Sequence, residues 1–80
     1  MIIYLEQCRG ARAMLGWSRE RLAKSSNVAI RTIVDFERGA RRPYDRTLVD
    51  VRKALEDAGI TFIDENGGGP GVRLSKRDGR

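Results

Sequence analysis

Arg31 and Asp35 stand four residues apart and combine a strong hydrogen-bond donor with a strong acceptor, and Ile30 and Val34 each precede one of them. An arginine can donate two hydrogen bonds to a guanine, and a carboxylate can accept one from the amino group of a cytosine. An isoleucine or valine side chain can rest against the methyl group of a thymine. On one exposed helix face, these four side chains could therefore read base pairs in the major groove of DNA.

The exposure of Ile30 and Val34 depends on the helical spacing around them. Ile33 and Phe36 are the expected inward residues of the same segment, and Val28 anchors the turn before it. At about 3.6 residues per turn, Ile30 and Val34 point away from the inward pair, which favours exposure. Packing into the core is the alternative for both.

Arginines that could contact phosphate flank this segment on both sides. They are Arg19, Arg38, Arg41, Arg42 and Arg46. Arg19 opens an expected helix, where free backbone N–H groups also favour an anion. The other four form a local positive patch whose planar side chains suit phosphate contacts. Such a patch could also be only a solvated surface.

The residue pattern predicts a mainly α fold with four helices. Their expected ranges are about 5–15, 19 to 25 or 26, 29–38 and 45–58. Ser18 is a good N-cap for the second helix, and Asn27 tolerates the left-handed conformation of a tight turn. Two short helices joined in this way are typical of a helix-turn-helix, whose second helix lies in the major groove. Arg12 falls on the inward face of the first helix and therefore needs a partner.

The last twenty residues change in character. Residues 60–63 and 72–74 are typical of strands, and the stretch between them is rich in turn residues. Together they predict a short C-terminal β-hairpin, with a flexible tail as the alternative. We therefore expect a helix-turn-helix domain over residues 1–59, a hairpin extension over 60–74 and a flexible basic tail over 75–80.

The composition is that of one small globular domain. The chain has 80 residues, of which 40% are hydrophobic and 34% charged, and its formal net charge is +5. A positive charge of this size is typical of a nucleic-acid binder, although it could also serve only solubility.

Side chains that catalysis and metal binding commonly need are scarce. The chain has no histidine, and its one cysteine, Cys8, cannot form an internal disulfide or a zinc site. Residues 67–71 are glycine-rich but lack the following Lys-Ser/Thr of a P-loop. We therefore expect no enzyme, no cofactor and no metal. The apolar run over residues 1–5 is too short for a signal or membrane segment, which favours a cytoplasmic, nucleoid-associated protein without a membrane partner.

The spacing of several residues resembles that of the Cro/cI-type helix-turn-helix family, also called xenobiotic-response-element or lambda-repressor-like. The matching positions, within roughly residues 7–59, are Arg12, Gly16, Leu22, Ala23, Val28, Thr32, Ile33, Glu37, Gly39, Pro43, Thr47 and Leu48. The resemblance implies a four-helix DNA-binding core and a buried ion pair between Arg12 and Glu37. That pair would supply the partner that the inward Arg12 needs.

The resemblance also implies which residues contact DNA. The phosphate contacts would be Arg19, Thr32, Arg41 and Arg42, and the base contacts Ile30, Arg31 and Asp35. Four positions depart from the family pattern. Asn27 replaces a turn glycine, Ala29 and Ile30 replace polar residues, and Arg19 replaces a common glutamine, which would make its phosphate contact a charged one.

These observations predict a sequence-specific transcriptional regulator that binds double-stranded DNA. We expect a repressor-like homodimer on a two-fold operator, with strand pairing at the edge of the 60–74 hairpin as its dimer contact. The alternative is an antitoxin-like interaction module that binds a partner protein as well as DNA. Its docking surfaces would be the apolar N-terminal run and the hairpin.

Overall fold

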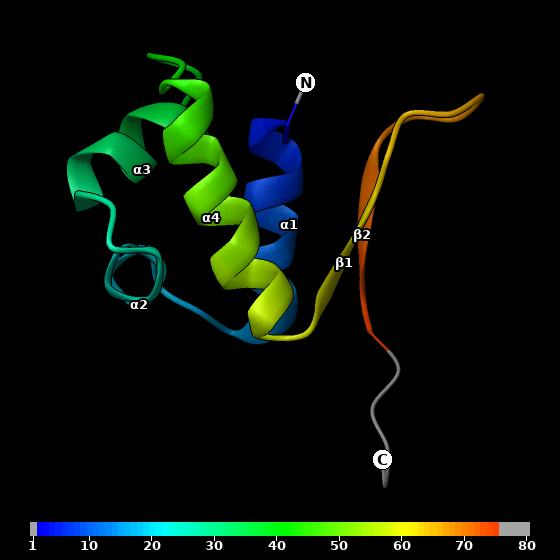
Figure 1. The fold of residues 1–80 in the computed structure, drawn as a ribbon, viewed down its shortest axis with the longest axis horizontal. Helices are drawn as coiled ribbons and strands as arrows, with labels where there is room; N and C mark the ends of the chain where they lie inside the picture. Colours follow the sequence, from blue (N-terminus) through cyan, green and yellow to red (C-terminus); the bar gives the residue numbers. More distant parts are fainter. Residues whose placement is uncertain (1, 76–80) are drawn as a thin grey trace, which may run out of the picture.

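The computed structural model describes residues 2–75, so all of the expected basic tail except Ser75 lies outside the described residues. Its elements are α1 (Leu5–Leu15), α2 (Arg19–Ser26), α3 (Ile30–Glu37), α4 (Asp45–Asp57), β1 (Ile60–Ile63) and β2 (Gly71–Leu74). The mainly helical fold with a C-terminal antiparallel hairpin confirms the predicted fold class (Figure 1). Among the helices described, none is both long and apolar enough to span a membrane.

Local capping interactions explain where α1 and α2 begin and end. Gly16 closes α1 in the left-handed conformation, with φ 68°. The Ser18 hydroxyl accepts a hydrogen bond from the Arg21 backbone N–H at 3.0 Å and so caps the start of α2. Asn27 ends α2 with φ 58°, as its tolerance of this conformation predicts. These two ends set the path of the chain into the next helix.

α3 is slightly shorter than the predicted range of 29–38. Ala29 stands at the N-cap with an extended backbone, φ −57° and ψ 137°, and its side chain has no atom that could accept a capping hydrogen bond. The helix therefore begins at Ile30, and it ends at Glu37 with Arg38 as its C-cap. The first turn of α3 thus carries backbone N–H groups without a side-chain cap.

The core is one cluster that joins all four helices with β1 and the N-terminal segment. Its members are Ile3, Cys8, Ala11, Leu22, Ile33, Phe36, Leu48, Val51, Ala54, Leu55, Ile60 and Phe62. Ile3 is fully buried. The expectation that the apolar N-terminal run offers a docking surface is therefore wrong for Ile3, because burial in the core stabilises the fold more than exposure would.

The hairpin packs on α1 and α4, and its turn projects beyond the helices (Figure 1). β1 and β2 pair in an antiparallel register that places Ile60 opposite Leu74 and Phe62 opposite Val72. At the base of the hairpin, the Ser75 N–H donates a hydrogen bond of 2.7 Å to the Gly59 carbonyl oxygen.

A buried glutamine fastens the other end of the hairpin to α1. The Gln7 side-chain amide donates hydrogen bonds to the carbonyl oxygens of Gly71, at 3.0 Å, and Ile63, at 3.3 Å. Its oxygen accepts a hydrogen bond of 2.8 Å from the Tyr4 backbone N–H. The Tyr4 hydroxyl in turn donates to Glu65 at 2.8 Å. The hairpin is therefore held by polar contacts as well as by apolar packing.

Candidate nucleic-acid interface

The outward face of α3 carries the four side chains that the sequence predicts as base readers. The Arg31 side chain is 83% exposed, and Ile30 is 40% exposed. Val34 and Asp35 are half-buried. The inward residues of the same helix are Ile33 and Phe36, both buried. The outward face therefore combines one cation, one anion and apolar carbon on a helix whose inward side packs into the core.

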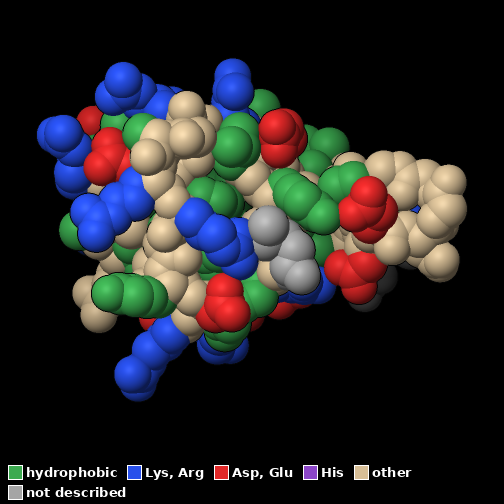
Figure 2. All heavy atoms as spheres, turned by 90° about the horizontal axis from the view of Figure 1, so that it is seen from above, with side chains coloured by type: hydrophobic (Ala, Val, Ile, Leu, Met, Phe, Trp, Pro, Cys, Tyr) green, Lys and Arg blue, Asp and Glu red, His purple; other side chains and the backbone are tan. Residues whose placement is uncertain are grey.

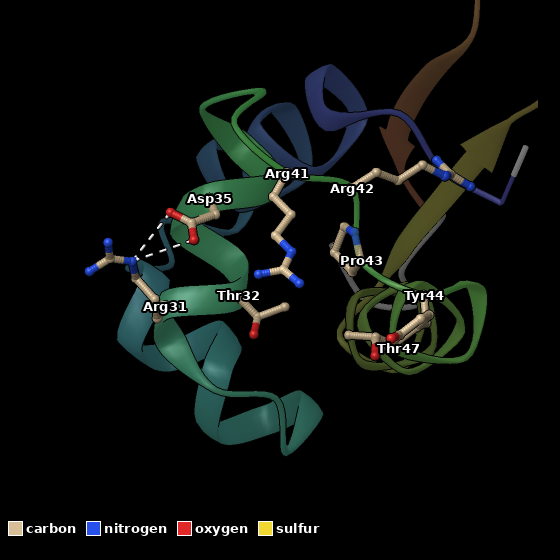
Figure 3. A pocket seen from close by; sticks show the side chains of 8 residues that line it. All are labelled: Arg31, Thr32, Asp35, Arg41, Arg42, Pro43, Tyr44 and Thr47. Carbon is tan, nitrogen blue, oxygen red and sulfur yellow. Dashed lines mark hydrogen bonds and ion pairs between the residues drawn. The ribbon is translucent and has the colours of Figure 1, made fainter.

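Arg31 and Asp35 form an ion pair across one helical turn. Arg31 Nε lies 3.3 Å from Asp35 Oδ1 and 3.4 Å from Oδ2. Figure 3 shows the terminal nitrogens of Arg31 directed away from the helix, with Asp35 behind them. The pair thus leaves the donor fork of Arg31 open to a ligand in front of α3.

A groove of about 370 Å³ runs between α3 and the start of α4. The residues that line it are Arg31, Thr32, Asp35, Arg41, Arg42, Pro43, Tyr44 and Thr47. In Figure 3, Arg41 extends into the space in front of Thr32. The groove therefore joins the candidate base readers to a cation from the chain segment that connects α3 with α4.

Tyr44 and Thr47 also line this groove, and neither is among the DNA contacts predicted from the sequence. Tyr44 is 84% exposed and stands at the N-cap of α4. No pattern in the sequence marks Tyr44 as a contact, because its place in the groove depends on where α4 begins relative to α3. Thr47 is one of the positions that match the family pattern.

The predicted phosphate residues occupy different places around the groove. Arg41 reaches into it, whereas Arg42 points away toward the N-terminal segment, and its Nη2 lies 3.0 Å from Asp45 Oδ1 (Figure 3). Arg38 and Arg46 are exposed but do not line the groove. Figure 2 shows Lys and Arg side chains gathered at the helical end of the molecule, away from the turn of the hairpin.

A buried carboxylate ties α1, α2 and α3 together behind this surface. Glu37 is fully buried, and its Oε1 lies 2.7 Å from Arg12 Nη2 and 2.9 Å from Arg19 Nε. Arg12 Nε donates to Glu37 Oε2 at 2.8 Å, and the Cys8 thiol donates to the same oxygen at 3.0 Å. Arg12 also donates to the Trp17 carbonyl oxygen at 3.0 Å. The ion pair that the family resemblance implies is therefore present, with Arg19 as an additional partner.

This network determines the protonation states of Glu37 and Cys8. Burial by itself raises the pKa of Glu37, but hydrogen bonds from Arg12, Cys8 and Arg19 outweigh it, and the pKa lies below its ordinary value. Burial, together with the hydrogen bond to Glu37, raises the pKa of the Cys8 thiol well above its usual range. At neutral pH, Glu37 is therefore charged and Cys8 is a neutral thiol.

The comparisons agree with this geometry. The helix-turn-helix family model, of the Cro/C1 type, matches residues 9–61, which extend from α1 to the start of β1. No curated protein matches the chain at a significant level of similarity. The matched range holds the complete α2–turn–α3 unit, the groove beside it and the buried ion pair. The chain belongs to the Cro/C1-type helix-turn-helix family of DNA-binding regulators.

Proposed function

We propose that the chain is a sequence-specific transcriptional regulator of the repressor type that places α3 in the major groove. The observation that carries this proposal is the exposed fork of Arg31 beside a groove into which Arg41 extends. Major-groove recognition needs a donor that can reach a base edge and a neighbouring cation that can bind phosphate. Arg31 supplies the donor from α3, and Arg41 supplies the cation from the segment that connects α3 with α4.

The proposed base contacts are Ile30, Arg31, Val34 and Asp35. Arg31 donates to a guanine, and Ile30 offers exposed methyl groups to a thymine. Val34 is half-buried, so only part of its side chain is available for such a contact. Asp35 accepts from a cytosine amino group or orients Arg31.

The proposed phosphate contacts surround α3 on both sides. The contacts predicted from the sequence are Arg19, Thr32, Arg38, Arg41, Arg42 and Arg46. The groove adds the hydroxyl groups of Tyr44 and Thr47 at the start of α4. Backbone N–H groups in the first turn of α4 lack a side-chain cap, and they can donate to a phosphate that these hydroxyl groups contact. Such contacts fix the register of the protein on DNA without reading its sequence.

We further propose that the regulator acts as a homodimer. One module of this size buries little DNA surface, so tight binding requires two half-sites about 34 Å apart. The exposed edge of the hairpin can pair with the same edge of a second copy. Sedimentation velocity of the free protein and of its complex with DNA tests this proposal. A monomer in both samples would exclude the dimer.

Selection of bound fragments from random DNA, at low and at high salt, tests the regulatory function. We expect one enriched motif with two inverted half-sites, and affinity that falls steeply with salt because phosphate contacts release counterions. Binding without any enriched motif would contradict sequence-specific regulation. A regulator of this kind would act at the nucleoid in the cytoplasm.

An antitoxin-like role that includes a partner protein is the second candidate. It is favoured by the hairpin, which projects from the helices and leaves Ile63 and Leu74 more than one-third exposed. Because Leu74 pairs with Ile60 and Ile63 pairs with Gly71, the two side chains lie at opposite ends and on opposite faces of the hairpin, so a partner strand or helix could cover one of them. Co-purification of the native protein with a protein encoded beside it would support this role, and recovery of the chain alone would count against it.

A further inference from the structure

Glu37 binds a second arginine in addition to Arg12. Arg19 Nε lies 2.9 Å from Glu37 Oε1, and the Arg19 side chain is 36% exposed. Among residues 2–75, Glu37 is the acceptor bonded to Arg19. Because only Nε is used, the two terminal nitrogens of Arg19 keep their donor groups for another acceptor.

The position of Arg19 makes this geometry relevant to DNA. Arg19 is the first residue of α2, and Glu37 is the last residue of α3, so their contact joins the two helices of the helix-turn-helix. The start of α2 also carries the positive end of the helix dipole. A phosphate at this place would meet both the Arg19 fork and the dipole.

We propose that Glu37 is a positioning residue for Arg19, which it holds at the start of α2 so that the terminal nitrogens bind a DNA phosphate. This inference rests on the proposed DNA-binding function and names one contact within it. The carboxylate restricts a long side chain before DNA arrives, which lowers the conformational entropy that binding would otherwise lose. Two guanidinium groups around one carboxylate also leave the cluster with a net positive charge.

A lysine at position 19 could not reproduce both contacts. Its ammonium is a compact point charge, whereas the arginine fork can donate to Glu37 through Nε and to a phosphate through the terminal nitrogens. A lysine ammonium that contacts the buried carboxylate of Glu37 could not also contact the phosphate. A lysine ammonium that contacts the phosphate could not also contact Glu37. Arg19→Lys therefore keeps the positive charge at position 19 but removes the donor geometry of the guanidinium group.

The first experiment compares Arg19→Lys with Arg19→Ala on the operator obtained by selection. We expect Arg19→Ala to weaken binding about tenfold at moderate salt and to lower the salt slope by about 0.9. We expect Arg19→Lys to lose at least half as much DNA affinity as Arg19→Ala, when both losses are expressed as logarithms of the binding constant. The matched control is Arg9→Lys, an exposed arginine on α1 that lies outside the groove, which should bind within twofold of wild type.

The second experiment is a double-mutant cycle for DNA affinity. Glu37→Gln should weaken binding at least fivefold more in the wild-type background than in the Arg19→Ala background. Equal losses in both backgrounds would show that Glu37 only supports the fold, and the inference would be wrong. Circular dichroism establishes that each variant is folded at the temperature of the assay.

The outcomes distinguish this inference from the proposed function. If Arg19→Lys binds like wild type, charge alone suffices at position 19 and only the positioning role is refuted. That result decides the question even if Glu37→Gln fails to fold. If the wild-type chain selects no DNA sequence, the proposed function itself fails.

Discussion

Arg31 shows how one exposed side chain can matter for recognition without mattering for stability. Its own side chain is 83% exposed in the pair with the half-buried Asp35, and ion pairs with such an exposed member contribute little to folding. Arg31→Ala should therefore leave the melting temperature near that of wild type. The same change should weaken operator binding by about 1–3 kcal/mol and relax specificity at one base pair. Fluorescence anisotropy with operators altered at single base pairs measures both effects, and an unchanged base preference would exclude Arg31 as a base reader.

Arg41 should behave differently because it extends into the groove beside Thr32. We expect Arg41→Ala to weaken binding to operator and to unrelated DNA by a similar factor. The slope of log affinity against log salt should fall by about 0.9, since one phosphate contact is lost. Titrations at several salt concentrations measure this slope, with Arg31→Ala as the comparison. Loss of affinity for the operator alone would instead place Arg41 at a base.

The ionisation of Glu37 makes the stability of the fold depend on pH. The pKa of Glu37 is lowered in the folded state, so the ionised carboxylate stabilises the fold. This stabilisation is complete above the pKa of the unfolded chain, about 4.3, and it is lost as the pH falls through the folded pKa. Glu37→Gln should cost about 3–5 kcal/mol at pH 7, because the change removes the buried anion and leaves the partly buried Arg12 without it. Urea unfolding should show the difference from wild type shrinking below about pH 4. A difference that stays constant from pH 7 to pH 3 would contradict this account.

At the level of elements, the hairpin depends on a residue of α1. Gln7 is buried, and its amide donates to two hairpin carbonyl oxygens while its oxygen accepts from the Tyr4 N–H. Gln7→Ala should therefore destabilise the fold by about 1–3 kcal/mol. Hydrogen exchange should accelerate first in the hairpin amides and only later in α2 and α3. Uniform acceleration across the chain would show that the hairpin has no separate opening.

The helices could be predicted from sequence because their signals are local. Ser18 and Asn27 act within a few residues of themselves, so the range of α2 follows from them. Ala29 provides no such signal, and the predicted start of α3 was one residue early for that reason. A helix boundary is thus as predictable as the cap that defines it.

Contacts between distant segments could not be predicted from the residues alone. Gln7 bonds to carbonyl groups 56 and 64 positions further along the chain, and no local pattern marks it as buried. The pair of Arg12 with Glu37 came from the family resemblance, whereas the additional contact of Arg19 depends on how α2 meets α3. Tyr44 belongs to the same class, since it lines the groove only because α4 begins beside α3.

At the level of the whole molecule, whose longest dimension is 36 Å, α3 and the hairpin lie on different sides of α1 and α4 (Figure 1). A net charge of +5 predicted a nucleic-acid partner but could not show where on the surface the charge would gather. The fold places arginines around α3 and leaves the hairpin apart from them. DNA and a second protein chain could therefore be bound at the same time.

The buried thiol of Cys8 has a practical consequence. Because this cysteine is the chain's only one, is fully enclosed and stays protonated, maleimide dyes should not modify the native protein. A single engineered surface cysteine would then take one fluorophore at a chosen place. Slow labelling of the native protein would in turn report how often its interior opens.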